Sequence, residues 1–221
     1  GVILCRYILG QRKKLGSLPQ KGVVAKTIVT TDLIALIARA FGIRVVDNLL
    51  IGFKYIGDVI NTLPPEAEFI YGAEESHGYL AGSSVRDKDA ASAAILLAEC
   101  AANLKEQDRS LRAYLDQIYA EYGYFQEVQK SVTRVGAKGS REIDCIMAAL
   151  RTDPPEQIGG YPVFEIIDRK IGKAANSKAG SVRDVAGAKG DAIAFTFSNP
   201  GHSRISARPS GTEPKIKYYV S

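Results

Sequence analysis

Apolar and polar positions follow two different periods in the first half of the chain. Helical spacing recurs over residues 1–15, 33–41, 53–63, 88–106 and 109–122. Short β-branched or apolar runs at 22–29, 43–46 and 69–71 lie between the early helical segments and predict strands. This alternation indicates a three-layer α/β/α domain, with a mixed sheet between the helices, over residues 1–122.

The pattern changes after Gly123. Strand-like runs at 124–134, 163–167, 192–197, 204–207 and 215–220 accompany a single helical segment at 140–150. They predict a smaller α+β domain with an antiparallel sheet over residues 123–221. Residues 170–190 are rich in Gly, Ala, Lys and Ser, and we expect a flexible loop without a core of its own.

Composition narrows the class of protein only slightly. Hydrophobic residues make up 46% of the 221 residues, and no run approaches the length of a membrane span, so no membrane partner is expected. The three cysteines are far apart and suggest a reducing, cytoplasmic location. A net charge of +5 suits phosphorylated small molecules, although it would suit nucleic acid as well.

The segment 208–214 reads RPSGTEP and precedes a strand-like run with two lysines. The guanidinium of Arg208, the hydroxyls of Ser210 and Thr212, and the backbone N–H groups around Gly211 form a donor set for a phosphate dianion. An ordinary hairpin turn would use the same proline, serine and glycine. A turn alone needs neither an arginine at its start nor Lys215 just beyond it, so phosphate binding is favoured.

A second polar loop, GAEESHG at 72–78, follows the apolar run 69–71. Glu74 and Ser76 are two residues apart at a strand end and can point the same way, as a grip for neighbouring sugar hydroxyls. Ligands of α/β domains bind beyond the carboxyl ends of the strands, which assigns both residues and Lys54 to the functional edge. Alternatively, the loop is simply polar, with Glu75 or Asp87 at a helix N-terminus.

Together these loops resemble the sugar-binding and phosphate-binding loops of the α-D-phosphohexomutases, the phosphoglucomutase/phosphomannomutase family. KTIVTTDL at 26–33 and GFKYIG at 52–57 resemble further segments of that family. The four motifs are in the family's order, and the resemblance runs over the whole chain. It implies the family's third domain over 1–122 and its fourth over 123–221.

The resemblance implies roles for individual residues of the first domain. Glu74 and Ser76 match the sugar grip, and Phe53 and Lys54 match a second sugar-contacting loop. Lys88 matches a catalytic lysine that faces the phosphoryl group, although a surface lysine at a helix start is nearly as good an interpretation. Lys26 lies in a family-like stretch, where a lysine at a strand edge is commonly just solvated.

The same resemblance assigns a phosphate-binding role to Arg208, Ser210, Gly211 and Thr212. Arg86 and Lys215 are further candidates for that role, because both are cationic and lie near the matched loops. Arg86 has an alternative as an ion-pair partner of a neighbouring aspartate. Lys215 and Lys217 share one strand face, and one of them can face the phosphate loop while the other faces solvent.

Members of the family are isomerases that move a phosphoryl group between C1 and C6 of a hexose, by way of a phosphoserine and a bisphosphate. Their nucleophilic-serine loop (TASHNP type) and metal loop (DxDxDR type) do not occur here. We therefore expect no metal ligands in this chain and no activity of the chain alone. Mg²⁺, a glucose 1,6-bisphosphate-type activator and the missing N-terminal domains would belong to an intact enzyme about twice as long.

Two other functions stay open. One is a phosphopentomutase of the same family, since Ile51, Ala73 and His77 depart from commoner residues and leave the sugar open. The other is a non-catalytic module that binds phosphorylated ligands or nucleic acid, for which the run KIKYY at 215–219 is the best support. Tyrosines on a terminal strand are more often half-buried sheet residues, so we favour the phosphorylated hexose as the ligand and expect no nucleic acid.

Overall fold

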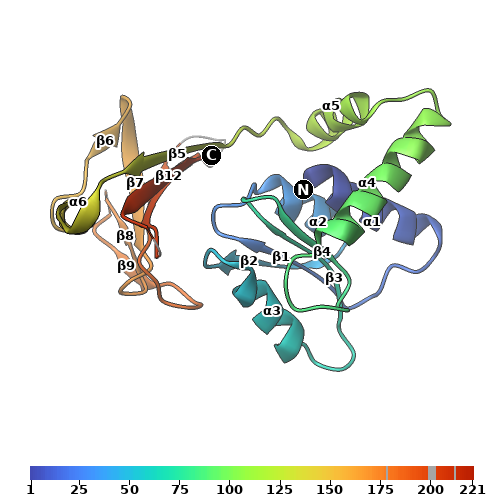
Figure 1. Cartoon of the computed structure of the whole chain (residues 1–221), viewed down its shortest axis with the longest axis horizontal. Coiled ribbons are helices and arrows are strands. Elements are labelled where there is room, and N and C mark those ends of the chain that lie inside the picture. The colour runs from blue at the N-terminus through green and yellow to red at the C-terminus, as the bar shows by residue number, and fades with distance from the viewer. Residues whose placement is uncertain (178, 199–202, 212) are drawn as a thin grey trace. The chain divides into compact units, whose positions relative to one another are not determined.

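A computed structural model describes residues 1–177, 179–198, 203–211 and 213–221. The chain divides into two compact units, residues 1–125 (unit 1) and 126–221 (unit 2), which are described separately below (Figure 1). The division lies three residues beyond the boundary expected from the sequence, at the end of the link that follows the last helix of unit 1. No helix among the described residues is long and apolar enough to cross a membrane.

Unit 1 is built from helices that alternate with the strands of one four-stranded sheet. Its elements are α1 (Val2–Lys14), β1 (Gly22–Thr27), α2 (Leu33–Ala40), β2 (Arg44–Leu49), α3 (Phe53–Thr62), β3 (Glu68–Glu74), β4 (Gly78–Ala81), α4 (Ala90–Lys105) and α5 (Leu111–Tyr122). The strand order is β2-β1-β3-β4, with β1 parallel to both of its neighbours and β4 antiparallel to β3. The mixed sheet and the α/β/α layers predicted from the sequence are confirmed.

Unit 1 has a hydrophobic core on each face of its sheet, and alternate residues of β1 pack into one core or the other. Val24 packs with apolar side chains of α1 and α2, whereas the next residue, Ala25, packs with Phe53, Ile56 and Ile60 of α3. Figure 1 shows α1 and α2 on one side of the sheet and α3 on the other. Because successive side chains of a strand point to opposite faces, β1 needs apolar residues throughout, and all six of its residues are buried.

The three parallel strands end at one edge of the sheet, and this edge carries the polar loops. β1 ends at Thr27, β2 at Leu49 and β3 at Glu74. The chain leaves β2 and enters α3 through Gly52, whose φ of +126° disfavours any residue with a side chain. The edge therefore brings together the starts of the β1–α2, β2–α3 and β3–β4 connections.

β4 was not predicted, because Gly78–Ala81 is only four residues long. It forms a tight hairpin with β3, in which Glu74 is the partner of Gly78 and Tyr71 is the partner of Ala81. The loop 72–78 is thus the end of one strand, a three-residue turn and the start of the next strand.

Unit 2 is an antiparallel sheet covered on one face by a single long helix among the described residues. Its elements are β5 (Val128–Thr133), α6 (Gly136–Thr152), β6 (Gln157–Ile158), β7 (Tyr161–Asp168), β8 (Lys173–Asn176), β9 (Val182–Asp184), β10 (Ile193–Phe197), β11 (Arg204–Pro209) and β12 (Lys215–Val220). The strand order is β5-β12-β11-β10-β7-β8-β9, and β6 pairs with β7. Ile143 and Met147 of α6 pack on Phe195, Ala207 and Ile216, which confirms an α+β domain with an antiparallel sheet.

The expectation of a structureless loop over 170–190 is wrong. β8 pairs with β7, from Glu165 opposite Asn176 to Asp168 opposite Lys173, and β9 pairs with β8. Ala174 is almost completely buried. Residues 173–176 and 182–184 form strands because they extend an edge of the sheet, which local composition does not reveal.

Candidate functional site

Glu74, the last residue of β3, holds a buried carboxylate at the edge where the three parallel strands of unit 1 end. Only 7% of its side chain is exposed, and its Oε1 lies 3.1 Å from Nζ of Lys88. The lysine is half exposed and comes from the loop that precedes α4. A carboxylate that is dry on one side and balanced by one flexible cation can still accept hydrogen bonds from a ligand through its other lone pairs.

Gly78 makes the room that this carboxylate occupies. A Cβ on Gly78 would lie 2.5 Å from Oε1 and 2.6 Å from Cγ of Glu74. Any other residue would displace the carboxylate, so the second glycine of the GAEESHG loop is a steric requirement of the glutamate that faces it.

Ser76 lies in the three-residue turn between β3 and β4, so the alternation of side chains along a strand does not apply to it. The side chain is exposed, and its Oγ donates to Oε1 of Glu75 over 3.1 Å. The turn closes with His77 at a φ of +60°, the left-handed position usually given to glycine in three-residue hairpin loops. The hydroxyl of Ser76 and the ring of His77 are thus presented to solvent beside Glu74.

The β1–α2 loop is fastened beneath this hairpin by Lys26, which the sequence led us to expect in solvent. That expectation is wrong: Lys26 is fully buried. Its Nζ donates to the carbonyl oxygens of Thr27 and Thr30, over 3.2 and 3.0 Å, and lies 2.7 Å from Oδ1 of Asp32. A buried ammonium needs such a set of acceptors, and here it fixes the loop that leaves β1.

Two threonines connect that loop to the hairpin. The hydroxyls of Thr27 and Thr30 lie 2.8 Å apart, and Thr27 also donates to Oε2 of Glu75 over 3.3 Å. Glu75 therefore holds the hairpin turn to the β1–α2 loop, whereas Glu74 points to Lys88. The two adjacent carboxylates have separate tasks, and the motif alone does not distinguish them.

Phe53 and Lys88 meet at the start of α3. Phe53 is buried in the core beneath α3, and Nζ of Lys88 lies 5.9 Å from the centroid of its ring. The aromatic face and Glu74 together hold the lysine over the edge of the sheet. Asp89 then starts α4, since its carboxylate accepts from the backbone N–H groups of Ala91 and Ser92.

Lys54 and Arg86, two further predicted site residues, contact side chains and backbone away from Glu74 and Lys88. Lys54 is exposed on α3, with Nζ 5.0 Å from the ring centroid of Tyr55. Arg86 donates from Nε to Oδ1 of Asn61 over 2.6 Å and from Nη1 to the carbonyl of Ser83. The alternative pairing of Arg86 with an aspartate is not found among the described residues, and the contact with Asn61 ties the loop 82–89 to α3.

In unit 2 the segment RPSGTEP at 208–214 begins with Arg208, which lies next to a second cation on the neighbouring strand. Arg208 of β11 is the direct partner of Lys217 of β12. The adjacent residues Ala207 and Ile216 point into the core under α6, so Arg208 and Lys217 point to the other face of the sheet. Neither side chain forms an ion pair among the described residues. Like charges directly opposite one another destabilise a sheet, unless an anion lies between or beside them.

The turn between β11 and β12 is closed by backbone hydrogen bonds. The N–H of Ser210 donates to the carbonyl of Lys215 over 2.8 Å, and the N–H of Lys215 donates to the carbonyl of Glu213 over 2.7 Å. Gly211 is exposed, and apart from its chain neighbours no atom of the described residues lies within 4 Å of the position of a Cβ. Thr212, the remaining residue predicted for this loop, lies outside the described residues.

Lys215 forms an ion pair with Glu213 of the same loop, and this partner lowers the pKa of the Glu213 carboxyl. Lys217 is therefore the better placed of the two lysines to share an anion with Arg208. The period of two along the strand already put residues 215 and 217 on one face in the sequence analysis, but it did not decide which of them faces the loop. The register with β11, which identifies the partner of Arg208, is not visible in the sequence.

The described residues do not fit the Mg²⁺ ion that the resemblance implies for an intact enzyme. No three His, Cys, Asp or Glu side chains in the described parts of the chain lie close enough to hold a metal ion together. We derive no step of a reaction through a metal for this chain.

Comparison with known proteins agrees with this geometry. A family model for the phosphoglucomutase/phosphomannomutase α/β/α domain III matches residues 1–122. The phosphoglucomutase of Staphylococcus epidermidis is 37% identical over 221 residues. The chain belongs to the phosphoglucomutase/phosphomannomutase family. Phosphoglucomutases of Staphylococcus aureus and Staphylococcus haemolyticus are 32% and 31% identical over the same length.

The chain covers only part of each of these family members. It aligns over its whole length with 39% of the Staphylococcus epidermidis protein. Among solved structures, the exocytosis-sensitive phosphoprotein parafusin (phosphoglucomutase) of Paramecium, in its open form, superposes with a TM-score of 0.62. That match covers 99% of this chain and 36% of the other at 16% identity, so it bears on the fold alone.

Proposed function

We propose that this chain is the sugar- and phosphate-recognition part of a phosphoglucomutase/phosphomannomutase. The whole protein interconverts hexose 1-phosphate and hexose 6-phosphate through a phosphoserine and a bisphosphate intermediate. The nucleophilic serine and the ligands of Mg²⁺ come from parts of the protein outside this chain. The bisphosphate intermediate, a glucose 1,6-bisphosphate, acts as the activator.

The observation that carries the proposal is the pair formed by Arg208 and Lys217. Two cations on adjacent strands, without an ion-pair partner among the described residues, flank a turn that carries the hydroxyl of Ser210 and the backbone N–H of Gly211. A phosphate dianion accepts from a guanidinium fork, an ammonium and backbone N–H groups at once. It removes the repulsion that the register of β11 and β12 imposes.

Glu74 supports the sugar half of the proposal. A hexose that presents either of its two phosphates to the serine must bind in two orientations. A carboxylate can accept from two adjacent hydroxyls in either orientation. Lys88, 3.1 Å from Glu74, is free to exchange part of that contact for an oxygen of the reacting phosphoryl group, and Ser76 and Lys54 add donors at the same edge.

Calorimetric titration with glucose 1,6-bisphosphate tests the phosphate site. Replacing Arg208 with alanine removes charge-assisted hydrogen bonds, and we expect affinity to fall about 10- to 100-fold. Lys217→Ala should weaken binding in the same direction. Arg112→Ala is the matched control, because Arg112 is an exposed arginine of unit 1 paired only with Asp116 among the described residues.

Binding that survives Arg208→Ala and Lys217→Ala unchanged would exclude the phosphate loop as the site. Glu74→Gln separates the two halves of the proposal, since it should reduce binding of the sugar phosphate without affecting that of inorganic phosphate. We expect no mutase turnover by the purified chain, and specific turnover that titrates with the protein would contradict a pure recognition role.

The rival function, a nucleic-acid-binding module, has less support. Such a module needs aromatic side chains presented to the bases. Tyr219 is buried, and Tyr218 packs on the core of unit 2. A titration with single-stranded DNA at two salt concentrations separates the functions, because a strong dependence of affinity on salt is typical of nucleic-acid binding.

A further inference from the structure

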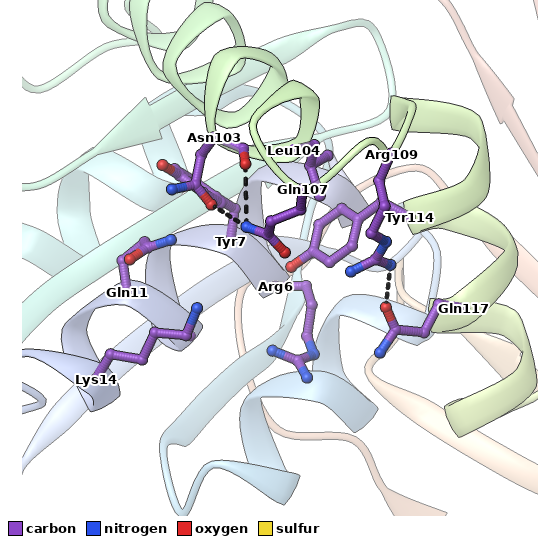
Figure 2. Close-up of a pocket in the computed structure, with 11 residues that line it drawn as sticks. Arg6, Tyr7, Gln11, Lys14, Asn103, Leu104, Gln107, Arg109, Tyr114 and Gln117 are labelled. Carbon is purple, nitrogen blue, oxygen red and sulfur yellow. Dashed lines mark hydrogen bonds between the residues drawn. The ribbon is translucent and has the colours of Figure 1, made fainter.

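Unit 1 contains a cavity outside the candidate site, among α1, the end of α4 and the start of α5 (Figure 2). Its volume is about 160 Å³, room for roughly five water molecules. The cavity shares no residue with the edge at Glu74. The 16-residue helix α4 begins next to Lys88 and ends at the cavity, and a helix of that length spans about 24 Å.

The walls of the cavity are cationic. Arg6 and Lys14 of α1 and Arg109 of the α4–α5 turn line it, and no carboxylate is among the lining residues. Lys14 and Arg109 form no ion pair among the described residues. Arg109 donates to the amide oxygen of Gln117 instead (Figure 2), and an amide cannot neutralise a guanidinium.

Arg6 has a donor left over. One Nη contacts a carboxylate oxygen of Glu121 at 3.3 Å, and the guanidinium lies 5.0 Å from the ring centroid of Phe41. The Nε atom is buried and has no hydrogen-bond partner among the described residues. A buried donor on a charged group without an acceptor is costly. Because this atom is closed to solvent, a ligand in the cavity would meet the guanidinium through its other nitrogen atoms.

Gly10 keeps the cavity open on the α1 side. Glycine is unfavourable inside a helix, and here a Cβ would lie 3.1 Å from Nη1 of Arg6. A larger residue at position 10 would fill part of the cavity and would crowd the guanidinium of Arg6, and glycine avoids both.

Side-chain amides complete the lining. Gln107 donates to both oxygens of Asn103, over 3.0 and 2.9 Å, and Gln11 and Gln117 face the same space. Amides both donate and accept, which suits hydroxyl groups. The hydroxyl of Tyr114 is also in the lining. Burial raises the pKa of Tyr114 to about 12, so the group stays neutral.

We propose that this cavity binds a small hydroxylated dianion of three or four carbons, as a second ligand site distinct from the sugar-phosphate site. The two negative charges match Lys14 and Arg109, the guanidinium of Arg6 adds positive charge to the wall, and the amides bind the hydroxyl. Carboxylates and phosphates share this chemistry, and a volume of about 160 Å³ suits a ligand of this size better than a hexose bisphosphate.

The test is a titration of the ¹⁵N-labelled 221-residue chain with L-malate, and separately with glycerol 3-phosphate, followed by backbone amide shifts. We expect saturable shifts in residues 6–14, 103–109 and 114–117. Lys14→Gln and Arg109→Gln should each weaken binding about three- to tenfold. Lys13→Gln is the matched control: it removes the same charge from the adjacent residue, which does not line the cavity, and should change affinity less than twofold.

The two ligands separate the possible acid groups, and comparison with the Arg208→Ala variant separates the two sites. Shifts confined to residues 208–217 would overturn the proposal, because they would assign the ligand to the phosphate loop. No saturation by either ligand up to 20 mM, on the order of the weakest affinity such a site would have, would overturn it too. So would equal effects of Lys13→Gln and Lys14→Gln.

Discussion

Gly78 faces Glu74 across the β3–β4 hairpin so closely that a methyl group on Gly78 would overlap the carboxylate, with its carbon 2.5 Å from Oε1. The position of the Glu74 carboxylate therefore depends on the absence of a side chain at Gly78. Lys88, at 3.1 Å on the other side, completes the confinement.

Gly78→Ala should displace Glu74 and weaken binding of a sugar phosphate about tenfold or more. The chain should stay folded, because Gly78 has an ordinary strand backbone and the clashing atoms belong to a side chain that can rotate. Calorimetric titration with glucose 1,6-bisphosphate measures the loss of affinity, and the thermal transition measures the loss of stability.

A double-mutant cycle with Glu74→Ala shows whether the clash is the cause. In the Glu74→Ala background the new methyl group has nothing to displace, so Gly78→Ala should cost almost nothing further. Additive losses in the two variants would contradict this explanation and would imply that Gly78 serves the ligand directly.

Gly211→Ala separates binding from folding in unit 2. Apart from its chain neighbours, no atom of the described residues lies within 4 Å of the position of a Cβ on Gly211, so the substitution should leave the free energy of unfolding unchanged. If the phosphate approaches the backbone of this turn, the methyl group will hinder it. We expect affinity for glucose 1,6-bisphosphate to fall about fivefold or more, on the scale of one lost hydrogen bond. Unchanged affinity would argue against contact between phosphate and the backbone at this residue.

Asp89 gives α4 an acid-sensitive start. Hydrogen bonds from Ser92 and Ala91 lower the pKa of its carboxyl below the ordinary value of 3.8. A lowered pKa in the folded state means that the cap stabilises the protein above about pH 3.8 and that this contribution is lost as the pH falls below it. Asp89→Ala should destabilise unit 1 at pH 7. It should also make the stability of unit 1 depend less on pH in the acid range.

Asn at this position distinguishes capping from charge. Asp89→Asn keeps an N-cap acceptor that does not titrate, so it should preserve most of the stability at pH 7 and show a weaker loss in acid. The measurement is the thermal transition between pH 3 and pH 7. If the thermal midpoint falls equally in acid for the unsubstituted chain, Asp89→Ala and Asp89→Asn, other carboxyl groups dominate the loss of stability.

The fold was largely predictable because its strongest patterns are local. The period of 3.6 over α2 and the β-branched run of β1 report burial directly, and their alternation identifies the layers. Lys26 shows where this reasoning stops. A lysine in a strand is usually solvated, and what buries this one is a set of acceptors at Thr27, Thr30 and Asp32, which exists only once the loop has folded.

The sequence analysis did not predict β8 and β9, for a related reason. Lys173–Asn176 and Val182–Asp184 contain few β-branched or aromatic residues, and their composition is typical of loops. They form strands because β7 offers a free edge, and that pairing is a property of the sheet rather than of the segment. The candidate site shows the same division, since the motif identifies Arg208 but only the register identifies Lys217.

The three thiols should differ sharply in reactivity. Burial raises the pKa of Cys5 to about 12 and that of Cys100 to about 11, and both side chains are buried. Cys145 is exposed on α6. A native titration with an aromatic disulfide reagent should therefore modify one thiol rapidly and the other two only after unfolding, because the thiolate is the reactive form. Cys145→Ser should abolish the fast phase.

Asp108 occupies the left-handed position at the end of α4, with a φ of +54°. Its N–H donates to the carbonyl of Lys105, and the N–H of Arg109 donates to the carbonyl of Leu104. This pair of bonds is a Schellman cap, in which glycine is the usual residue at the left-handed position. The strained residue orients the turn that carries Arg109 to the cavity of unit 1.

Asp108→Gly should relieve this strain and stabilise unit 1 by about 0.5–1 kcal/mol, which corresponds to a rise of about 2–4 °C in the thermal midpoint. Asp108→Ala should have the opposite effect, since alanine has neither the freedom of glycine nor the local hydrogen bonding of aspartate. If the alanine variant is as stable as the glycine variant, the left-handed backbone is not a source of strain. If Asp108→Gly is stabilised but binds L-malate less tightly, the rigidity of this turn contributes to the position of Arg109.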